Sequence, residues 1–186
     1  MAEAASFGGT RSLLANVAGA LLVPRHAAPA GEADRERLAA ELGELFEETL
    51  VARDDDAEDP LQLFEEATAI ERSVVEGLFA VLQGARTERV LVVEPDAPLG
   101  RHDLWLALTA WPESVAVVLV ASGRVVASLY SRERMIEATR SLLTAEPAGG
   151  ASIARLHQSI EASVVSPADL GLVPLADSEP APGGTC

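Results

Sequence analysis

Directly after one apolar segment, the chain has several side chains that are able to bind a cation or to transfer a proton. That segment, Arg89–Pro95, is rich in β-branched residues and predicts a buried central strand. Carboxylates and imidazoles at the carboxyl end of such a strand are typical of α/β ligand sites, where they hold a hard cation or act as general acid or base. The candidate ligand-binding residues are Glu94, Asp96, His102, Asp103 and Trp105.

A plainer interpretation of this cluster stays open. It is a solvated loop in which Asp103 does no more than cap the helix that follows, and Trp105 is a core residue rather than the wall of a ligand pocket. We therefore assign no catalytic residue, no metal ligand set and no cofactor from the sequence.

The stretch RVLVVEPDAPL (Arg89–Leu99) resembles the first strand and acidic cluster of response-regulator receiver domains. The resemblance implies a phosphoacceptor aspartate at the end of a later strand, followed by a lysine. After Asp103 the next aspartate is Asp169, and the chain contains no lysine. Phosphoacceptor chemistry is therefore not predicted.

The absence of lysine excludes further chemistries. All 14 basic residues are arginines, so a Walker A phosphate loop and Schiff-base or pyridoxal-phosphate catalysis are ruled out. The single cysteine, Cys186, excludes an internal disulfide and a thiolate zinc site. A lysine-free composition is typical of a GC-rich genome or of a salty cytoplasm.

The chain is strongly acidic, with a net charge of −15 over 186 residues. Sixteen acidic and only four basic residues fall between Gly31 and Glu76. Such a surface repels phosphate backbones and anionic lipid, which disfavours nucleic-acid binding unless high salt screens the charge.

Apolar periodicity predicts three helices in the first half of the chain, at Thr10–Val23, Asp34–Ala52 and Pro60–Gly84. The second would bury its leucines and expose an acidic face that includes Glu41. The third follows heptad spacing, which indicates packing on a sheet or against a second copy. Its predicted partner or dimer surface comprises Leu61, Phe64, Val75, Leu78 and Leu82.

The second half changes to strand periodicity. After the strand at Arg89–Pro95 we expect a short helix at Asp103–Trp111, a hairpin that turns at Gly123, and a helix beginning at Ser131. A last helix is predicted over Ala151–Val165. The fold class is α/β (α+β), with an N-terminal helical segment followed by a small sheet covered by helices.

This pattern divides the chain into five regions by composition. They are an N-terminal amphipathic helix and linker (1–30), an acidic helical region (31–84), a small α/β core (85–146), a C-terminal helix (147–175) and a disordered tail (176–186).

The apolar stretch Ser12–Val23 has the outline of a signal peptide, ending in small residues at Ala28–Ala30. Glu3, Asn16 and Gly19 interrupt that pattern, and a docked amphipathic helix explains it as well. No apolar run reaches the length of a membrane span. We predict a cytoplasmic protein, with export as the alternative.

The hairpin VAVVLVASGRVVAS resembles that of roadblock-type scaffolding folds, in which helices cover a small sheet. This resemblance favours a module that binds a protein or small ligand. We therefore predict a non-enzymatic regulatory or adaptor protein, forming a homodimer. The alternatives are a metal-assisted hydrolase or phosphoryl-transfer enzyme using the Glu94–Asp103 loop, and a transcriptional regulator with a winged-helix fragment at 131–165.

Overall fold

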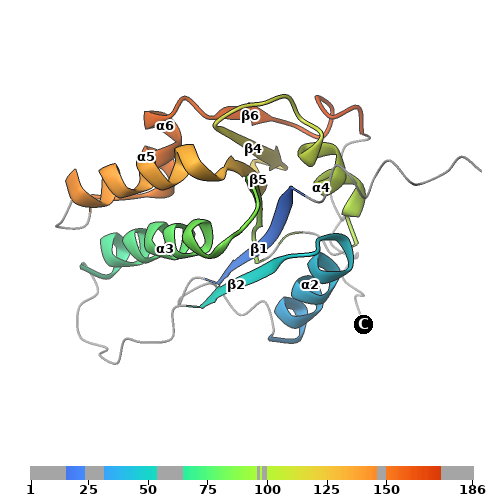
Figure 1. Ribbon diagram of the computed structural model, residues 1–186, viewed down its shortest axis with the longest axis horizontal. Coiled ribbons are helices and arrows are strands. Elements are labelled where there is room, and N and C mark those ends of the chain that lie inside the picture. Colours follow the sequence, from blue (N-terminus) through green and yellow to red (C-terminus); the bar gives the residue numbers. More distant parts are fainter. Residues whose placement is uncertain are drawn as a thin grey trace, which may run out of the picture.

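A computed structural model of the chain places one six-stranded mixed sheet at the centre of five helices (Figure 1). The structure describes residues 16–23, 32–53, 65–95, 97, 100–145 and 150–172. The strands are β1 (Val17–Val23), β2 (Thr49–Arg53), β3 (Arg89–Val93), β4 (Ala116–Ala121), β5 (Arg124–Ser131) and β6 (Ser163–Val165). The helices are α2 (Glu32–Leu45), α3 (Glu65–Gly84), α4 (His102–Thr109), α5 (Arg132–Ala145) and α6 (Ile153–Ser159). The predicted α/β class is confirmed.

The strands lie in the order β2-β1-β3-β5-β4-β6. β1 runs parallel to both β2 and β3, and β6 runs parallel to β4. Only β5 is reversed, because it pairs antiparallel with β3 on one side and β4 on the other. The carboxyl ends of five strands therefore meet at one edge of the sheet, where β5 begins.

Helices cover both faces of the sheet, so the fold has three layers (Figure 1). Leu42 of α2 and Trp105 of α4 belong to the core cluster on one face. Leu78 of α3, Met135 of α5 and Leu156 of α6 belong to the cluster on the other. Each central strand alternates its side chains between the two clusters, as a pleated strand must when both its faces are buried.

The helix predicted for Thr10–Val23 is wrong over its described part, because Val17–Val23 forms the strand β1. β1 lies between two parallel neighbours and is buried on both faces, so it is continuously apolar and shows no strand alternation. Gly19 is needed here, because a Cβ at this position would stand 2.7 Å from Cδ2 of Phe46. The segment compared above with a signal peptide thus supplies a central strand.

Two further predicted helices end early. The helix predicted to reach Ala52 stops at Leu45, and Thr49–Arg53 forms the edge strand β2 beside β1. The helix predicted to reach Val165 stops at Ser159, and Ser163–Val165 pairs with β4 as β6. In both cases a strand partner that is distant in sequence decides the structure. The predicted strand at Arg89, the hairpin at Gly123 and the helices after Asp103 and Ser131 are confirmed, within a few residues at their ends.

The surface predicted for a partner or a dimer is largely part of the chain's own core. Val75, Leu78 and Leu82 are completely buried, and the latter two pack in the cluster between α3 and the sheet. Their heptad spacing reflects packing on the sheet, so these three residues offer no free surface. Leu61 and Phe64 lie outside the described residues.

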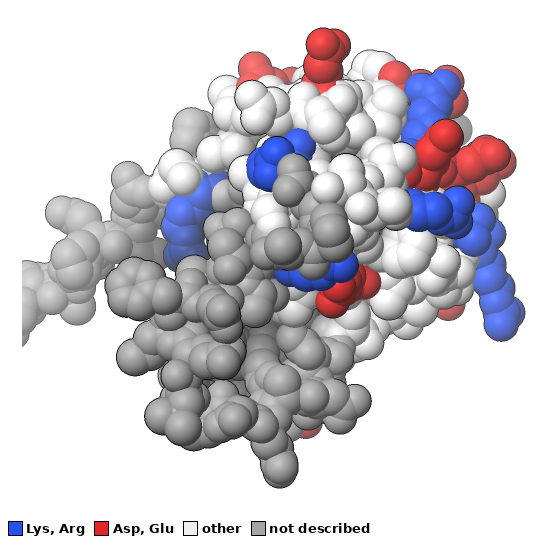
Figure 2. All heavy atoms as spheres, turned by 90° about the vertical axis from the view of Figure 1, so that its left-hand side faces the viewer, with Lys and Arg blue, Asp and Glu red and all other residues white. Residues whose placement is uncertain are grey.

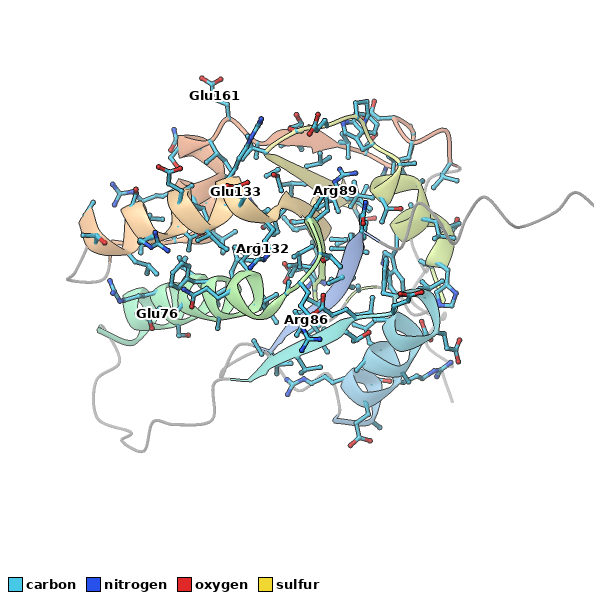
Figure 3. The ribbon with its side chains drawn as sticks, in the orientation of Figure 1. Glu76, Arg86, Arg89, Arg132, Glu133 and Glu161 are labelled. Atoms are coloured by element: carbon cyan, nitrogen blue, oxygen red, sulfur yellow. The ribbon has the colours of Figure 1, made fainter. Side chains whose placement is uncertain are left out.

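Arginines from other elements hold the carboxyl ends of two helices (Figure 3). Arg132 donates from Nε to the carbonyl of Leu82, in the last turn of α3, at 2.9 Å. Arg89 donates to the carbonyls of Thr109 and Trp111 at the end of α4, at 2.9 and 3.4 Å. Neither helix has a basic residue in its own last turn. A cation there stabilises the negative end of the helix dipole and satisfies free carbonyls.

The surface charges are mixed on the face that Figure 2 shows. The described arginine side chains lie among acidic and uncharged ones, so they form no continuous positive patch on this face. Proteins bind a phosphate backbone through such a patch. Within the described residues, no helix is long and apolar enough to cross a membrane.

A buried polar pair joins β5 to α6. The Tyr130 hydroxyl lies 2.8 Å from Nε2 of His157. Burial lowers the pKa of His157 and raises the pKa of Tyr130 above its ordinary value. Both groups are therefore neutral near pH 7, and one hydrogen bond joins the phenol to the imidazole.

This pair predicts a pH-dependent stability. Because the pKa of His157 is lower in the folded than in the unfolded chain, its contribution is complete above pH 6.5 and is lost as the pH falls below that value. We expect His157→Gln to reduce the loss of unfolding free energy between pH 7.5 and 5.5 in urea titrations. Equal losses for both proteins would contradict this assignment.

Candidate functional site

The arrangement of the first three strands creates a topological switch point. From β1 the chain passes through α2 to β2 on one side, and it then passes through α3 to β3 on the other side of β1. α2 and α3 cover opposite faces of the sheet. Open α/β sheets bind ligands at the carboxyl ends of the two neighbouring strands whose connections diverge in this way. β1 and β3 therefore mark the candidate site.

Glu94 is the first residue after β3 and lies at this switch point. Its N–H donates to the carbonyl of Val126 at 3.0 Å, and its carbonyl accepts from the N–H of Ala97 at 2.9 Å. These bonds fix the backbone in a turn on the end of the strand. Burial raises the pKa of the Glu94 carboxyl, and the charge of Arg124 opposes that shift.

Arg124 is the first residue of β5, directly after the turn that joins β4 to β5. Ser122 and Gly123 have φ of 50° and 73°, so both adopt the left-handed conformation of a two-residue hairpin turn. Because β5 begins at the edge where β3 ends, this turn brings an exposed guanidinium towards the half-buried Glu94. The edge thus carries one negative and one positive group.

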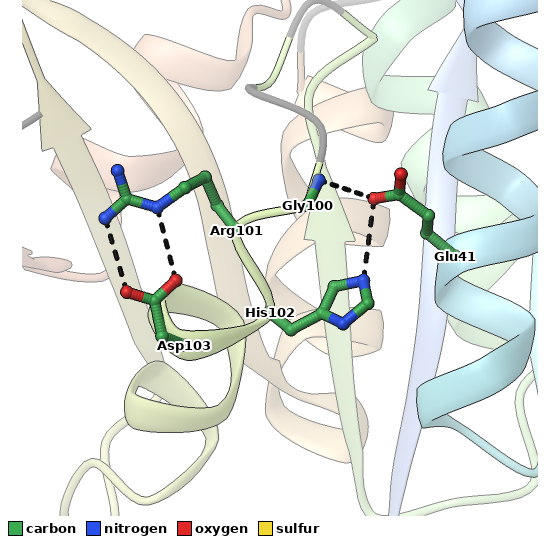
Figure 4. Close-up of polar contacts among 5 residues, drawn as sticks. All are labelled: Glu41, Gly100, Arg101, His102 and Asp103. Atoms are coloured by element: carbon green, nitrogen blue, oxygen red, sulfur yellow. Dashed lines mark hydrogen bonds and ion pairs between the residues drawn. The ribbon is translucent and has the colours of Figure 1, made fainter.

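The connection from β3 to α4 is attached to α2 (Figure 4). Gly100, at φ 71°, donates its N–H to Oε2 of Glu41 at 2.7 Å. His102 Nε2 lies 3.5 Å from the same oxygen, an ion-pair distance when the imidazole is protonated but without hydrogen-bond geometry. The His102 ring also lies 5.4 Å from that of Trp105.

The five predicted ligand-binding residues divide into separate environments. Glu94 lies at the switch point, His102 lies against α2, and Asp96 is outside the described residues. Asp103 is half exposed, and its two carboxylate oxygens lie 3.2 and 3.3 Å from the Arg101 guanidinium. Desolvation raises the pKa of Asp103, but the bonds to Arg101 and to backbone N–H groups outweigh it, so the pKa is lowered. Trp105 is completely buried in the core. This burial agrees with the plainer interpretation of Trp105 as a core residue.

The sequence pattern did not identify two residues, Glu41 beside Gly100 and Arg124 near Glu94. Glu41 was placed on the solvated face of α2, yet its side chain is only 15% exposed. It follows Leu38 by three residues and therefore lies on the same side of the helix, which is the signal that could have identified it. Arg124 had no signal, because only the pairing of β5 with β3 brings it near Glu94.

The described residues contain no group of three or more His, Cys, Asp and Glu side chains that could hold a metal ion. One or two protein carboxylates, together with oxygens of the ligand, are typical of magnesium sites. Glu94 could supply one such oxygen, but these residues alone do not define a metal site.

The fold, but not the sequence, is similar to known proteins. No family model matches the chain, and no curated protein matches it. A protein of Aquifex aeolicus (Aq1419) superposes with a TM-score of 0.60 at 16% identity, over 88% of this chain and 95% of that one. The 2-C-methyl-D-erythritol 4-phosphate cytidylyltransferase of Thermus thermophilus superposes with a TM-score of 0.50 at 18% identity, over 82% and 95% of the two chains.

These similarities correct the predicted function. The adaptor hypothesis assumed a roadblock-type scaffold and an exposed helical surface, but the fold is similar to that of a cytidylyltransferase, and the described part of that surface is buried. The regulatory and signalling assignment fails for the same reason. The proposed winged-helix fragment at 131–165 is also wrong, because β5, α5, α6 and β6 belong to the same sheet and its cover.

Proposed function

We propose that this chain is a transferase that acts on a nucleotide substrate, of the nucleotidyl- or glycosyltransferase class. The proposal is carried by one observation: an ionisable, half-buried carboxyl group, Glu94, lies at the switch point of a fold shared with a cytidylyltransferase. A buried carboxyl group with a raised pKa at such a position is a candidate for a functional site.

In this proposal Glu94 and Arg124 have complementary roles. The Glu94 carboxylate accepts hydrogen bonds from substrate hydroxyls or binds a cation that accompanies the phosphates. Arg124 offers a planar guanidinium suited to phosphate oxygens, and it supplies positive charge on an otherwise acidic protein. Its exposed position at the start of β5 leaves it accessible from solvent.

Binding and turnover test the proposal directly. We expect at least one of CTP, UTP, ATP, GTP and UDP-glucose, with Mg²⁺, to raise the melting temperature at millimolar concentration. Glu94→Gln should weaken the binding measured by calorimetry about tenfold, or about 1.4 kcal/mol. Release of pyrophosphate would identify nucleotidyl transfer, and release of a nucleoside diphosphate would identify glycosyl transfer.

Glu113→Gln is the matched control, because Glu113 is an exposed carboxylate before β4, at the opposite edge of the sheet. It should bind nucleotide like the wild type. If no nucleotide in the series binds, or if both variants lose affinity equally, the proposed function is wrong.

A further inference from the structure

The contact between α2 and the β3–α4 connection joins the two sides of the candidate site. α2 follows β1 in the chain, whereas Gly100 and His102 follow β3. Glu41 provides the α2 side of this contact, and its carboxylate faces both residues of the connection (Figure 4). The contact therefore spans the divergence between β1 and β3.

The partly buried position of Glu41 on α2 costs its carboxylate hydration free energy. A carboxylate that is 15% exposed loses most of its hydration, and such a group needs compensating hydrogen bonds or charges. The Gly100 N–H, at 2.7 Å, and the nearby His102 imidazole supply that compensation. Arg37, 3.8 Å away one turn earlier on α2, adds a weak ion pair with a largely exposed guanidinium.

The carboxylate also selects one conformation of the connection. Gly100 is in the left-handed region, which glycine can occupy but does not by itself favour over others. Without this bond, the Gly100 N–H would donate to water. Holding this amide, two residues before α4 begins, keeps the start of α4 against α2, and the bonds of Glu94 to Val126 and Ala97 separately fix the backbone after β3.

We propose that Glu41 is a positioning residue, which holds the β3–α4 connection against α2 and so keeps the Glu94 end of the switch point in its nucleotide-binding arrangement. This inference rests on the proposed function for the identity of the ligand. The attachment of the connection to α2 is independent of it.

The test combines hydrogen exchange with binding of CTP and Mg²⁺, or of whichever nucleotide in the series above binds the wild type. We expect Glu41→Ala to speed exchange of the Gly100 region at least tenfold, with β3 unchanged, and to weaken nucleotide binding about fivefold to tenfold. Glu41→Gln retains an oxygen acceptor for the Gly100 N–H, so it should restore most of the protection. Glu44→Ala, an exposed position on the same helix, is the control and should change neither.

Unchanged exchange at Gly100 in Glu41→Ala would overturn the attachment. Faster exchange with unchanged nucleotide affinity would overturn the positioning role. If the wild type binds no nucleotide, the proposed function fails separately, and the exchange comparison alone decides whether Glu41 holds the connection. Should Glu41→Ala not fold, Glu41→Ser against Glu44→Ser gives the same comparison, because the serine side chain is too short to reach the Gly100 N–H.

Discussion

Replacing Trp105 by alanine is expected to destabilise the protein by about 3–5 kcal/mol. The indole is completely buried beside Leu104 and Leu108 of α4, in the cluster that also holds α2 against the sheet. Truncation removes a large apolar area and leaves a cavity that the surrounding helices cannot fill. Urea titration at pH 7 measures the loss as a lower midpoint with an unchanged m-value.

Trp105→Phe separates this core role from the ligand role predicted from the sequence. The Trp105 Nε1 has no hydrogen-bond partner among the described residues, so phenylalanine forfeits no polar contact there. We expect a cost of about 1–2 kcal/mol and unchanged nucleotide affinity. A folded, stable Trp105→Ala protein that has lost only ligand binding would contradict the core assignment.

Gly19→Ala is expected to destabilise the protein by about 1–3 kcal/mol, against the usual trend for this substitution. At an open strand or helix position, exchanging glycine for alanine gains about 0.5–1 kcal/mol of backbone entropy. At Gly19 the new methyl group would stand 2.7 Å from Cδ2 of Phe46 and 3.4 Å from Cβ of Leu42. Both side chains are buried, so α2 or the Phe46 ring must move.

A double-mutant cycle identifies the cause. Phe46→Leu should relieve the collision, so Gly19→Ala should cost less in that background than in the wild type. Gly77→Ala in α3 is the matched control, because a Cβ there meets Leu22 and Ala52 only at 3.8 and 3.9 Å. It should stabilise the protein by about 1 kcal/mol. Equal effects at Gly19 and Gly77 would refute the steric argument.

The fold was predictable from the sequence wherever local signals decide it. β3 is apolar and β-branched, the β4–β5 hairpin contains Gly123 at its turn, and α5 has a clear amphipathic period. β1 was taken for a helix because a strand buried on both faces has no alternation. β6 was missed because three residues carry too little pattern to indicate a strand that pairs with β4.

The candidate site was predictable only in part, for a related reason. Glu94 was found because its place after an apolar strand is a local feature. Arg124, whose charge acts on Glu94, comes from the start of β5, and Glu41, which holds Gly100, comes from α2; only the assembled sheet brings these elements to the β3–α4 connection. For Trp105 the sequence left both a ligand and a core role open, because a short helix does not show which of its sides faces the core.

The central place of β1 also determines how the chain must assemble during its synthesis. β1 leaves the ribosome before either of its partners, and its second partner, β3, follows only after α2, β2 and α3 have been made. Until then a continuously apolar segment lacks one row of backbone partners, which is the condition under which nascent chains aggregate or recruit chaperones. Non-local parallel pairing of this kind is slow. β1, at the switch point, is therefore the first strand of the described sheet to be made, and its backbone pairing is completed only when Arg89–Val93 has emerged.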